Sequence, residues 1–168
     1  IGFDAGGSDR KVSAVVNGEV IHSEEVVWFP KVNEDPDYHY AGILDSFRRA
    51  AAKMPRVDAI GVSSAGIYID NEVRVASLFI KVPQDLFDEK VRNMYIRAAK
   101  EIGDVPLTVA NDGDVTALAG ALSLKDGRVL GIAMGTSEAV GYVNKDGNLN
   151  GWLSELAFVP VDYNKGAM

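Results

Sequence analysis

The sequence predicts an α/β protein in which a mixed sheet is flanked by helices and is followed by the start of a second, duplicated unit. An apolar stretch at residues 1–5 runs into Gly6, Gly7 and Ser8, and glycine lets a turn bring its backbone close to a ligand. The same arrangement returns 129 residues later, at residues 130–137. Between the two copies, short apolar strands alternate with amphipathic helices, as they do in α/β proteins.

The two glycine turns stand in one repeat register. The positions shared by the two copies are Gly2 with Gly131, Gly6 with Gly135, Ser8 with Ser137, and the hairpin-turn pairs Asn17-Gly18 with Asp146-Gly147. Bare N–H groups in such turns form a nest for phosphate oxygens, so two turns facing each other across a cleft suit one polyphosphate tail. In the alternative interpretation, both turns are ordinary hairpin connections.

Only the first copy carries a carboxylate at this position, because Asp4 aligns with Ala133 in the repeat register. A phosphate tail held between two turns needs one metal ion. Magnesium usually keeps several of its waters, so a single protein carboxylate is enough to hold it. The asymmetry between the copies therefore fits a magnesium ion at the first turn.

The composition narrows the class of protein. With 47% apolar and 24% charged residues, the 168-residue chain has the profile of a soluble globular protein. No apolar run approaches the roughly 18 residues of a membrane span, so we expect no membrane partner. The net charge of −7 is scattered along the chain, which argues against nucleic acid as a partner of these residues. The absence of cysteine excludes disulfides and thiolate metal sites and fits a cytoplasmic protein.

Hydrophobic periodicity predicts the elements of the first part of the chain. Alternation over residues 11–29 predicts two strands joined by a tight turn. Residues 30–37 have the composition of a loop, which either borders a ligand or lies on the surface. Apolar residues recur at helical spacing over residues 38–53, which predicts a helix packed on the sheet with Asp37 as its N-cap.

The later part of the chain continues the alternation. Residues 59–62 are continuously apolar, as in a central parallel strand that is covered on both faces. The further predicted elements are a strand at about residues 72–80, a helix after Pro83 with its buried stripe at Phe87, Val91, Met94, Ala98 and Ile102, a strand at residues 106–110 and a helix at residues 115–123. We place a domain boundary near residue 127, which gives an N-terminal domain 1–127 and the beginning of a second domain at 128–168.

Polar residues follow two of the predicted strands. A small-residue turn at residues 63–66 comes after one strand, and Asp112 comes after the other. Open α/β sheets bind ligands at the carboxyl ends of their strands. Plain turn chemistry is the alternative for the serines of the first turn, and helix capping is the alternative for Asn111 and Asp112. The presence of Asp4 at another strand end favours catalysis, because a carboxylate near a phosphate tail can accept the proton of an attacking hydroxyl.

These segments together resemble the sugar kinases of the actin, hexokinase and chaperone ATPase superfamily, which share a ribonuclease H-like domain, and within it the ROK (repressor, open reading frame, kinase) family. The similarity covers nearly the whole chain and keeps the family's motif order. Residues 4–8 resemble the first phosphate hairpin D-x-G-G-T, residues 61–66 resemble G-x-x-x-P-G near the sugar, residues 109–114 resemble V-x-N-D-A-N, residues 135–137 resemble the start of the second phosphate turn, and residues 152–158 resemble the segment with a sugar-binding glutamate.

The resemblance implies a carbohydrate kinase that transfers a phosphoryl group from ATP, with Mg²⁺, to a hydroxyl of a hexose or amino sugar in the cytoplasm. Asp112 is the implied catalytic base, and Asp4 is the implied magnesium ligand, acting through water. The implied phosphate-binding residues are Gly6, Gly7, Ser8, Gly135, Thr136 and Ser137. The implied substrate-binding residues are Ser64, Gly66, Asn111, Asp112 and Glu155.

The chain also departs from the family pattern. Phe158 stands where the family usually has a histidine that orients the sugar or binds zinc, so we expect no zinc. Residues 137–140 replace most of the second glycine run, and residues 76–78 lack the asparagine that the family often places near the sugar. These differences leave open a sugar-sensing regulatory protein of the same fold with weak or no kinase activity, and also a sugar-independent ATPase. A homodimer is a further possible assembly.

The two ends of the sequence suggest that the chain continues beyond them. Ile1 already lies inside a predicted strand, and the second unit stops soon after its hairpin. We therefore expect these residues to be part of a longer polypeptide that supplies the rest of the nucleotide pocket. A protein that ended at Met168 is expected to transfer no phosphoryl group.

Overall fold

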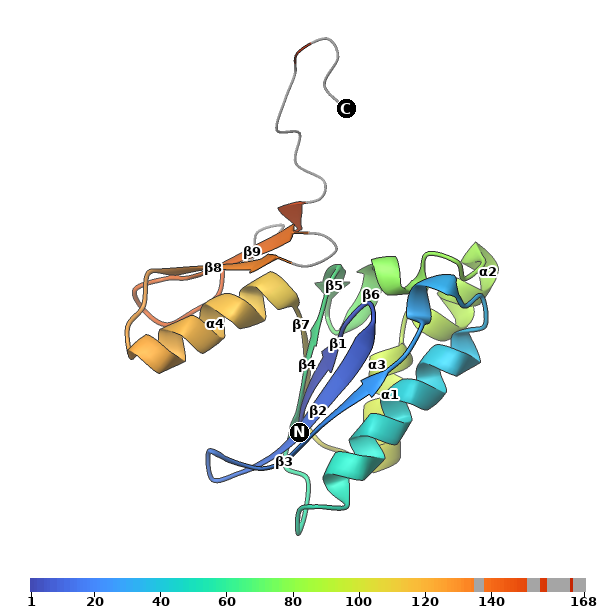
Figure 1. Ribbon diagram of the computed structural model, residues 1–168, viewed down its shortest axis with the longest axis horizontal. Helices are drawn as coiled ribbons and strands as arrows, with labels where there is room; N and C mark the ends of the chain where they lie inside the picture. Colours follow the sequence, from blue (N-terminus) through green and yellow to red (C-terminus); the bar gives the residue numbers. More distant parts are fainter. Residues whose placement is uncertain (135–137, 151–154, 157–163, 165–168) are drawn as a thin grey trace. The chain divides into compact units, whose positions relative to one another are not determined.

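The computed structural model describes residues 1–134, 138–150, 155, 156 and 164 (Figure 1). The chain divides into two compact units, Ile1–Asp112 and Gly113–Met168. Each unit is described separately below. Within the described ranges, no helix combines the length and the apolar character that crossing a bilayer requires.

The first unit is built on a five-stranded mixed sheet. Its strands, in spatial order, are β3 (Glu19–Val27), β2 (Asp9–Val16), β1 (Gly2–Ala5), β4 (Ile60–Ser64) and β7 (Leu107–Asn111). The first three strands are antiparallel neighbours, whereas β1, β4 and β7 run parallel to one another. The predicted mixed sheet is confirmed, and β4 is its central parallel strand. The tight turn between β2 and β3 has positive φ at both Asn17 and Gly18, as its sequence predicts.

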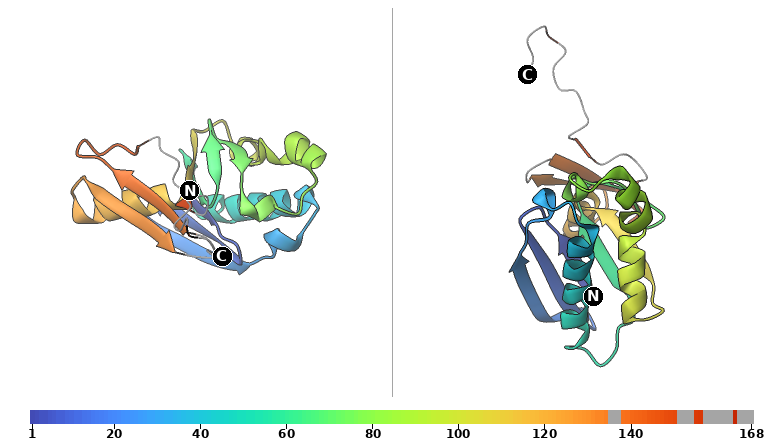
Figure 2. Two further views of the ribbon diagram at one scale, coloured as in Figure 1. Left: turned by 90° about the horizontal axis from the view of Figure 1, so that it is seen from above. Right: turned by 90° about the vertical axis from the view of Figure 1, so that its right-hand side faces the viewer.

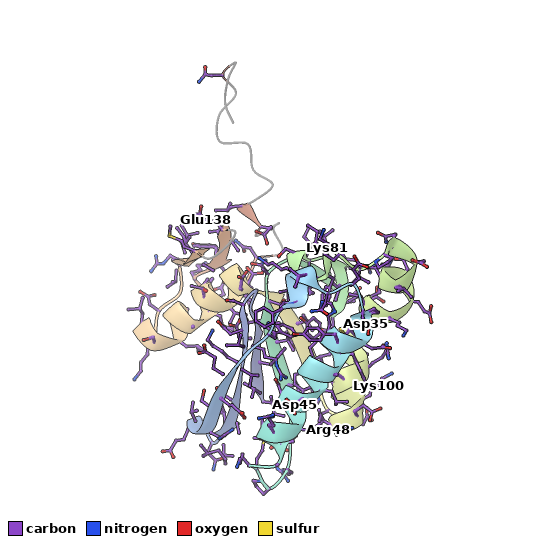
Figure 3. The ribbon with its side chains drawn as sticks, turned by 45° about the vertical axis from the view of Figure 1, so that its right-hand side comes forward. Asp35, Asp45, Arg48, Lys81, Lys100 and Glu138 are labelled. Carbon is purple, nitrogen blue, oxygen red and sulfur yellow. The ribbon has the colours of Figure 1, made fainter. Side chains whose placement is uncertain are left out.

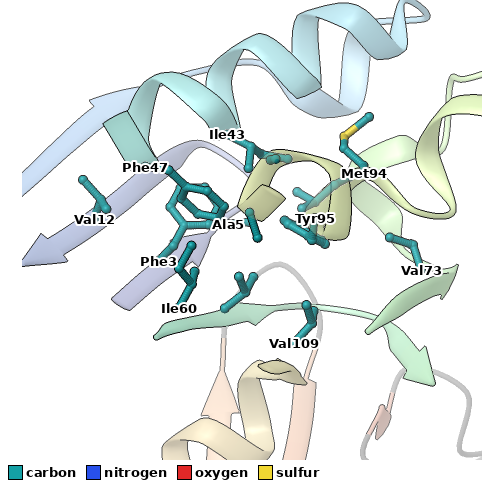
Figure 4. Packing of buried hydrophobic residues seen from close by; sticks show 14 of the residues in the cluster. Phe3, Ala5, Val12, Ile43, Phe47, Ile60, Val73, Met94, Tyr95 and Val109 are labelled. Atoms are coloured by element: carbon teal, nitrogen blue, oxygen red, sulfur yellow. The ribbon is translucent and has the colours of Figure 1, made fainter. Parts of the chain in front are cut away.

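Two helices pack on one face of this sheet, α1 (Pro36–Ala51) and α3 (Met94–Ile102). Figure 2 shows them side by side, in contact along the same face. Successive side chains of a strand point to opposite faces, so alternate residues of β1, β4 and β7 enter this core. Figure 4 shows the packing, in which the Phe3 and Phe47 rings meet edge to face at 5.3 Å between centroids. The largest fully buried apolar side chains of the first unit include Ile43, Phe47, Ile60, Val73, Leu78, Phe79, Val91, Met94 and Tyr95.

Helix α1 begins earlier than the periodicity predicted. Its N-cap is Asp35, not Asp37, because the Asp35 side chain accepts a hydrogen bond from the Asp37 N–H. Pro36 occupies the first helical position, where its missing N–H costs nothing. Figure 3 shows Asp35 at the start of α1, with Asp45 and Arg48 further along the helix.

The segment between β4 and α3 differs from its prediction in two ways. The strand expected at about residues 72–80 is shorter, β6 (Glu72–Val75), and it pairs with β5 (Ile67–Ile69) in a separate two-stranded sheet. The expected single helix is interrupted: α2 (Gln84–Leu86) leads into a π-helical turn, η3 (Phe87–Val91), before α3 begins. The carbonyl of Arg92, directly after this turn, accepts a 2.9 Å hydrogen bond from Val73 N–H of β6, a long-range contact that periodicity cannot reveal.

In the second unit, helix α4 (Asp112–Leu124) packs on an antiparallel hairpin of β8 (Val129–Met134) and β9 (Glu138–Val143). Only the first residue of α4, Asp112, belongs to the first unit. Glycines allow this close packing. A Cβ atom at Gly131 would lie 2.3 Å from Ala117 N, and one at Gly141 would lie 2.4 Å from the Asp114 Cα. The predicted helix 115–123 therefore lies on the second hairpin. The domain boundary near residue 127 of the whole protein stays a prediction.

Candidate functional site

The candidate site of the first unit lies at the carboxyl edge of its parallel strands. Ala5 of β1 pairs with Ser64 of β4, which pairs with Asn111 of β7, so the three strands end in one row. Their continuations, residues 6–8, the turn at 65–66 and Asp112, therefore leave the sheet at the same edge. Asp4 is one residue before the end of β1, in the row of Ser63.

The turn at residues 6–8 is closed by contacts that require glycine. A Cβ atom at Gly6 would lie 2.7 Å from the carbonyl oxygen of Asp9, so a larger residue would push the two segments apart. The buried Trp28 holds the turn from outside the hairpin. Its indole Nε1 donates to the Gly6 carbonyl at 2.8 Å, and its backbone N–H donates to the Ser8 carbonyl at 3.1 Å. From the sequence, Trp28 belongs only to the predicted strands of residues 11–29, and no local pattern indicates this contact.

Asn111 and Gly66 are joined directly. The Asn111 side-chain amide donates to the Gly66 carbonyl at 2.9 Å, and Asn111 is buried. Gly66 has a φ of 135°, and a Cβ there would lie 2.4 Å from the Val75 carbonyl oxygen, so only glycine fits this turn. Two of the predicted substrate-binding residues thus form one hydrogen-bonded unit at the strand ends.

Ser64 points into the interior of the unit. It is fully buried, and its hydroxyl lies 3.5 Å from the Ala5 carbonyl and 3.4 Å from the Tyr95 hydroxyl. The hydroxyls of Tyr95 and Ser64 thus connect α3 to the end of β1, directly below the glycine turn. A contact between Ser64 and a sugar stays a prediction, and its observed partners are parts of the protein itself.

Two tyrosines of this cluster are influenced by the charges of Asp4 and Asp112. Burial raises the pKa of Tyr95 to about 12, and the negative charge of Asp4 adds to the rise. Burial also raises the pKa of Tyr68 well above its usual value, with smaller contributions that include the charge of Asp112. The rings of Tyr68 and Tyr95 lie 6.2 Å apart between centroids. Asp4 and Asp112 therefore both act on one pair of neighbouring phenols.

The remaining predicted site residues belong to the second unit. Glu155 is buried and forms an isolated β-bridge with Ala139. The predicted phosphate-binding residues Gly135, Thr136 and Ser137 lie outside the described residues, and so does Phe158.

A hollow of about 310 Å³ lies elsewhere in the first unit, between α1 and the strands β2 and β3. Its lining includes Arg10, Trp28, Gly42 and Asp45. Arg10 is buried and donates to Asp45 at 3.0 Å. Burial opposes ionisation of Asp45, but hydrogen bonds from Arg49 and Arg10 outweigh it and lower the pKa of Asp45. These contacts fix α1 to the edge of the sheet.

Comparison with known proteins identifies the fold. A scan against protein families finds no match, and a search of curated proteins finds none either. Solved structures do match. The chain is similar to the inorganic polyphosphate/ATP-glucomannokinase of Arthrobacter sp. strain KM, with a TM-score of 0.71 and 21% identity over 96% of this chain and 63% of that one. It is also similar to the ROK hexokinase of Thermus thermophilus, with a TM-score of 0.62 and 17% identity over 92% of this chain and 49% of that one.

A third similar structure is a ROK family transcriptional regulator, a homologue of the E. coli MLC protein, with a TM-score of 0.59 and 19% identity over 91% of this chain and 38% of that one. The chain therefore has the α/β fold of the actin and hexokinase class. Within that class it has the fold of the ROK sugar kinases, and it spans between about two fifths and two thirds of the length of these three structures.

Proposed function

We propose that the protein is a sugar kinase that transfers a phosphoryl group from ATP to a sugar hydroxyl. The observation that carries this proposal is the common end of the three parallel strands. It brings Asp4, the glycine turn and Asp112 to one edge of the sheet, where open α/β sheets bind their ligands. The similarity in fold to an ATP-glucomannokinase and a hexokinase supports the same class of reaction.

The first unit supplies three functions in this proposal. The N–H groups of the turn at residues 6–8 bind the phosphate oxygens of ATP. The Asn111–Gly66 pair holds the sugar at the strand ends. Asp112 accepts the proton of the attacking hydroxyl, as a general base. Catalysis of this type is mostly positioning, because the phosphoryl group needs little further assistance once it is in line with the hydroxyl.

The residues of the first turn fit a magnesium ion. Magnesium prefers oxygen ligands and commonly keeps most of its waters, and Asp4 offers a half-buried carboxylate beside the turn. Within the described ranges, no group of three or more His, Cys, Asp or Glu side chains could hold a metal ion. Asp4 would therefore hold magnesium together with water and the phosphates themselves. When bound, the ion neutralises charge on the phosphate oxygens.

The test compares two aspartates at opposite ends of one helix. ADP release is measured on the purified full-length protein with a panel of hexoses and amino sugars, for the wild type, Asp112→Asn and Asp126→Asn. Asp126 is exposed just beyond the end of α4 and matches the change of charge. Loss of the base should reduce turnover by about 100-fold or more with little change in sugar affinity. Equal turnover in the wild type and Asp112→Asn would overturn the assignment of the base.

A regulatory protein is the second candidate. The similarity to a ROK transcriptional regulator favours it, as do the altered residues 137–140 of the second turn. A sensor of this kind binds a sugar without measurable ADP release. Sugar-independent ADP release would instead identify an ATPase, so the same assay separates the kinase from the ATPase, and a sugar-binding measurement identifies the sensor.

A further inference from the structure

The connection between β3 and α1 wraps around the glycine turn of the first unit. This connection, residues 28–35, includes the short 3-10 helix η1 (Pro30–Val32). Trp28 holds the carbonyl oxygens of Gly6 and Ser8, as described above. In a planar trans peptide the N–H points away from the carbonyl of the preceding residue. The Gly7 N–H therefore points away from the Trp28 indole.

Lys31 lies directly against this turn. A Cβ atom built on Gly7 would lie 2.9 Å from Lys31 Cε and 3.0 Å from Lys31 Nζ, so the lysine side chain occupies the space that any side chain at position 7 would need. The end of the Lys31 side chain therefore packs directly against Gly7. This contact joins residues that are 24 positions apart in the sequence.

The charge of Lys31 is not used within the described part of the protein. Across the residues that the structure describes, its ammonium group makes no ion pair with a carboxylate. Asp9, directly after the turn, is already paired with Lys11. Lys90, a comparable half-buried lysine near α1, is paired with Asp37 at 2.9 Å. Lys31 therefore differs from these two lysines in having no carboxylate partner among the described residues.

The backbone that carries Lys31 is fixed on both sides. Pro30 is buried, and its carbonyl is 2.9 Å from Nε2 of the buried His39. The Phe29 N–H donates to the Tyr38 hydroxyl at 2.9 Å, and the Phe29 carbonyl accepts from the Asn33 side chain at 2.7 Å. Two of these contacts, to His39 and Tyr38, tie Phe29 and Pro30 to the first turns of α1, so the backbone from which the Lys31 side chain reaches the glycine turn is fixed.

We propose that Lys31 is a phosphate-binding residue of the first turn and contributes a positive charge to the polyphosphate chain held there. The inference rests on the proposed function and adds to it a ligand outside the glycine motif. A lysine ammonium is a compact charge that binds phosphate oxygens well, and a charge-assisted hydrogen bond is stronger than a neutral one. The ligand chemistry is a polyphosphate with magnesium, whether it comes from a nucleotide or from inorganic polyphosphate.

Titration calorimetry on the purified full-length protein tests this assignment with two probes, MgATP and magnesium tripolyphosphate. The variants are Lys31→Met, which keeps the apolar stem, Lys31→Arg, which keeps the charge, and Lys53→Met, an exposed lysine just beyond α1 as the matched control. Lys31→Met should weaken both probes by about tenfold, whereas Lys31→Arg should stay within about threefold of the wild type. The salt dependence of binding should also become shallower in Lys31→Met, because one screened charge is lost. Thermal melts without ligand should coincide for all four proteins.

Each contrary result has its own meaning. A wild type that binds a probe, together with a Lys31→Met variant that binds it as tightly as Lys53→Met does, overturns the assignment of Lys31 while leaving the proposed function standing. Weakening confined to MgATP also overturns it, since the lysine would then contact the nucleoside. A wild type that binds neither probe overturns the proposed phosphate turn itself, and the assignment of Lys31 fails with it.

Discussion

The two hairpins that share a repeat register differ in what their glycines do. In the first hairpin, Gly2 of β1 has open space where a side chain would stand, with nothing within 4 Å of a Cβ atom. Its counterpart Gly131 of β8 lies under α4, where a Cβ would meet the backbone of Ala117 at 2.3 Å. A side chain could therefore be accommodated at Gly2, whereas the matching position 131 requires glycine.

The turn at Asn17-Gly18, between β2 and β3, also differs from its counterpart at Asp146-Gly147, after β9. Asn17 and Gly18 form a two-residue connection with positive φ at both positions. The matching Asp146-Gly147 belongs to a three-residue connection, because Asn144 N–H donates to the Asn148 carbonyl and, within this connection, only Gly147 has positive φ. The Asn144 side chain accepts from the N–H groups of Asp146 and Asn148 and closes this longer turn. The glycines therefore stand at matching positions of the repeat register, while the local geometry around them differs.

The largest expected effect comes from substituting the equivalent strand glycines. Gly131→Ala should destabilise the second unit by about 3 kcal/mol or more, because the new methyl group meets helix backbone that cannot move aside. Gly2→Ala should be neutral or slightly stabilising, since alanine costs less than glycine in a strand. Hydrogen exchange of α4, β8 and β9 measures the first change and exchange of β1 the second. Similar protection in both variants would show that the close packing of α4 on Gly131 does not affect stability.

The next largest effect is a loss of stability at alkaline pH, which we expect from the buried Tyr95. Tyr95 keeps its proton in the folded protein up to about pH 12, because burial raises its pKa to about 12. The unfolded chain releases that proton above about pH 10, so the unfolding free energy should fall by about 1.4 kcal/mol per pH unit between these values. Stability from this group is complete below pH 10. Urea titrations from pH 9 to 12 should show a shallower fall in Tyr95→Phe, and parallel curves would contradict the prediction.

The hydrogen bond from Trp28 to the glycine turn predicts a smaller change in the free energy of unfolding. Trp28→Phe removes the donor to the Gly6 carbonyl and should cost about 1–3 kcal/mol. Phe29→Ser changes the neighbouring side chain, which is 63% exposed, and should stay within about 0.5 kcal/mol of the wild type. Urea unfolding measures both variants. Equal midpoints would mean that the indole does not hold the turn.

The smallest expected difference is between the two turn glycines. Gly18 and Gly147 have φ values of 84° and 83°, and a Cβ atom at either position would have no other atom within 4 Å. Alanine at either site should therefore cost about 1–2 kcal/mol from backbone strain alone. The two losses, measured by hydrogen exchange of the flanking strands, should agree within about 0.5 kcal/mol. A larger gap would mean that turn length, and not φ, sets the cost.

The sequence by itself determined the features that depend on short-range patterns. The glycine turn after β1, the tight turn at Asn17-Gly18 and the apolar start of β4 all follow from residues close together in the chain. The position of Asp112 at a strand end follows in the same way, since a strand and the helix after it can be recognised from local periodicity. The mixed sheet flanked by helices is confirmed because it is built from such elements.

Only the tertiary structure decided which distant residues meet. The contact of Lys31 with Gly7, the hydrogen bond from Trp28 to Gly6 and the interruption of the helix before α3 depend on segments that lie far apart in the sequence. The same holds for Gly131, whose role comes from the helix packed on it. Periodicity reports which face of an element is buried, but not which side chain covers it. For that reason the sequence located the glycine turn, while the charge beside it became visible only in the folded chain.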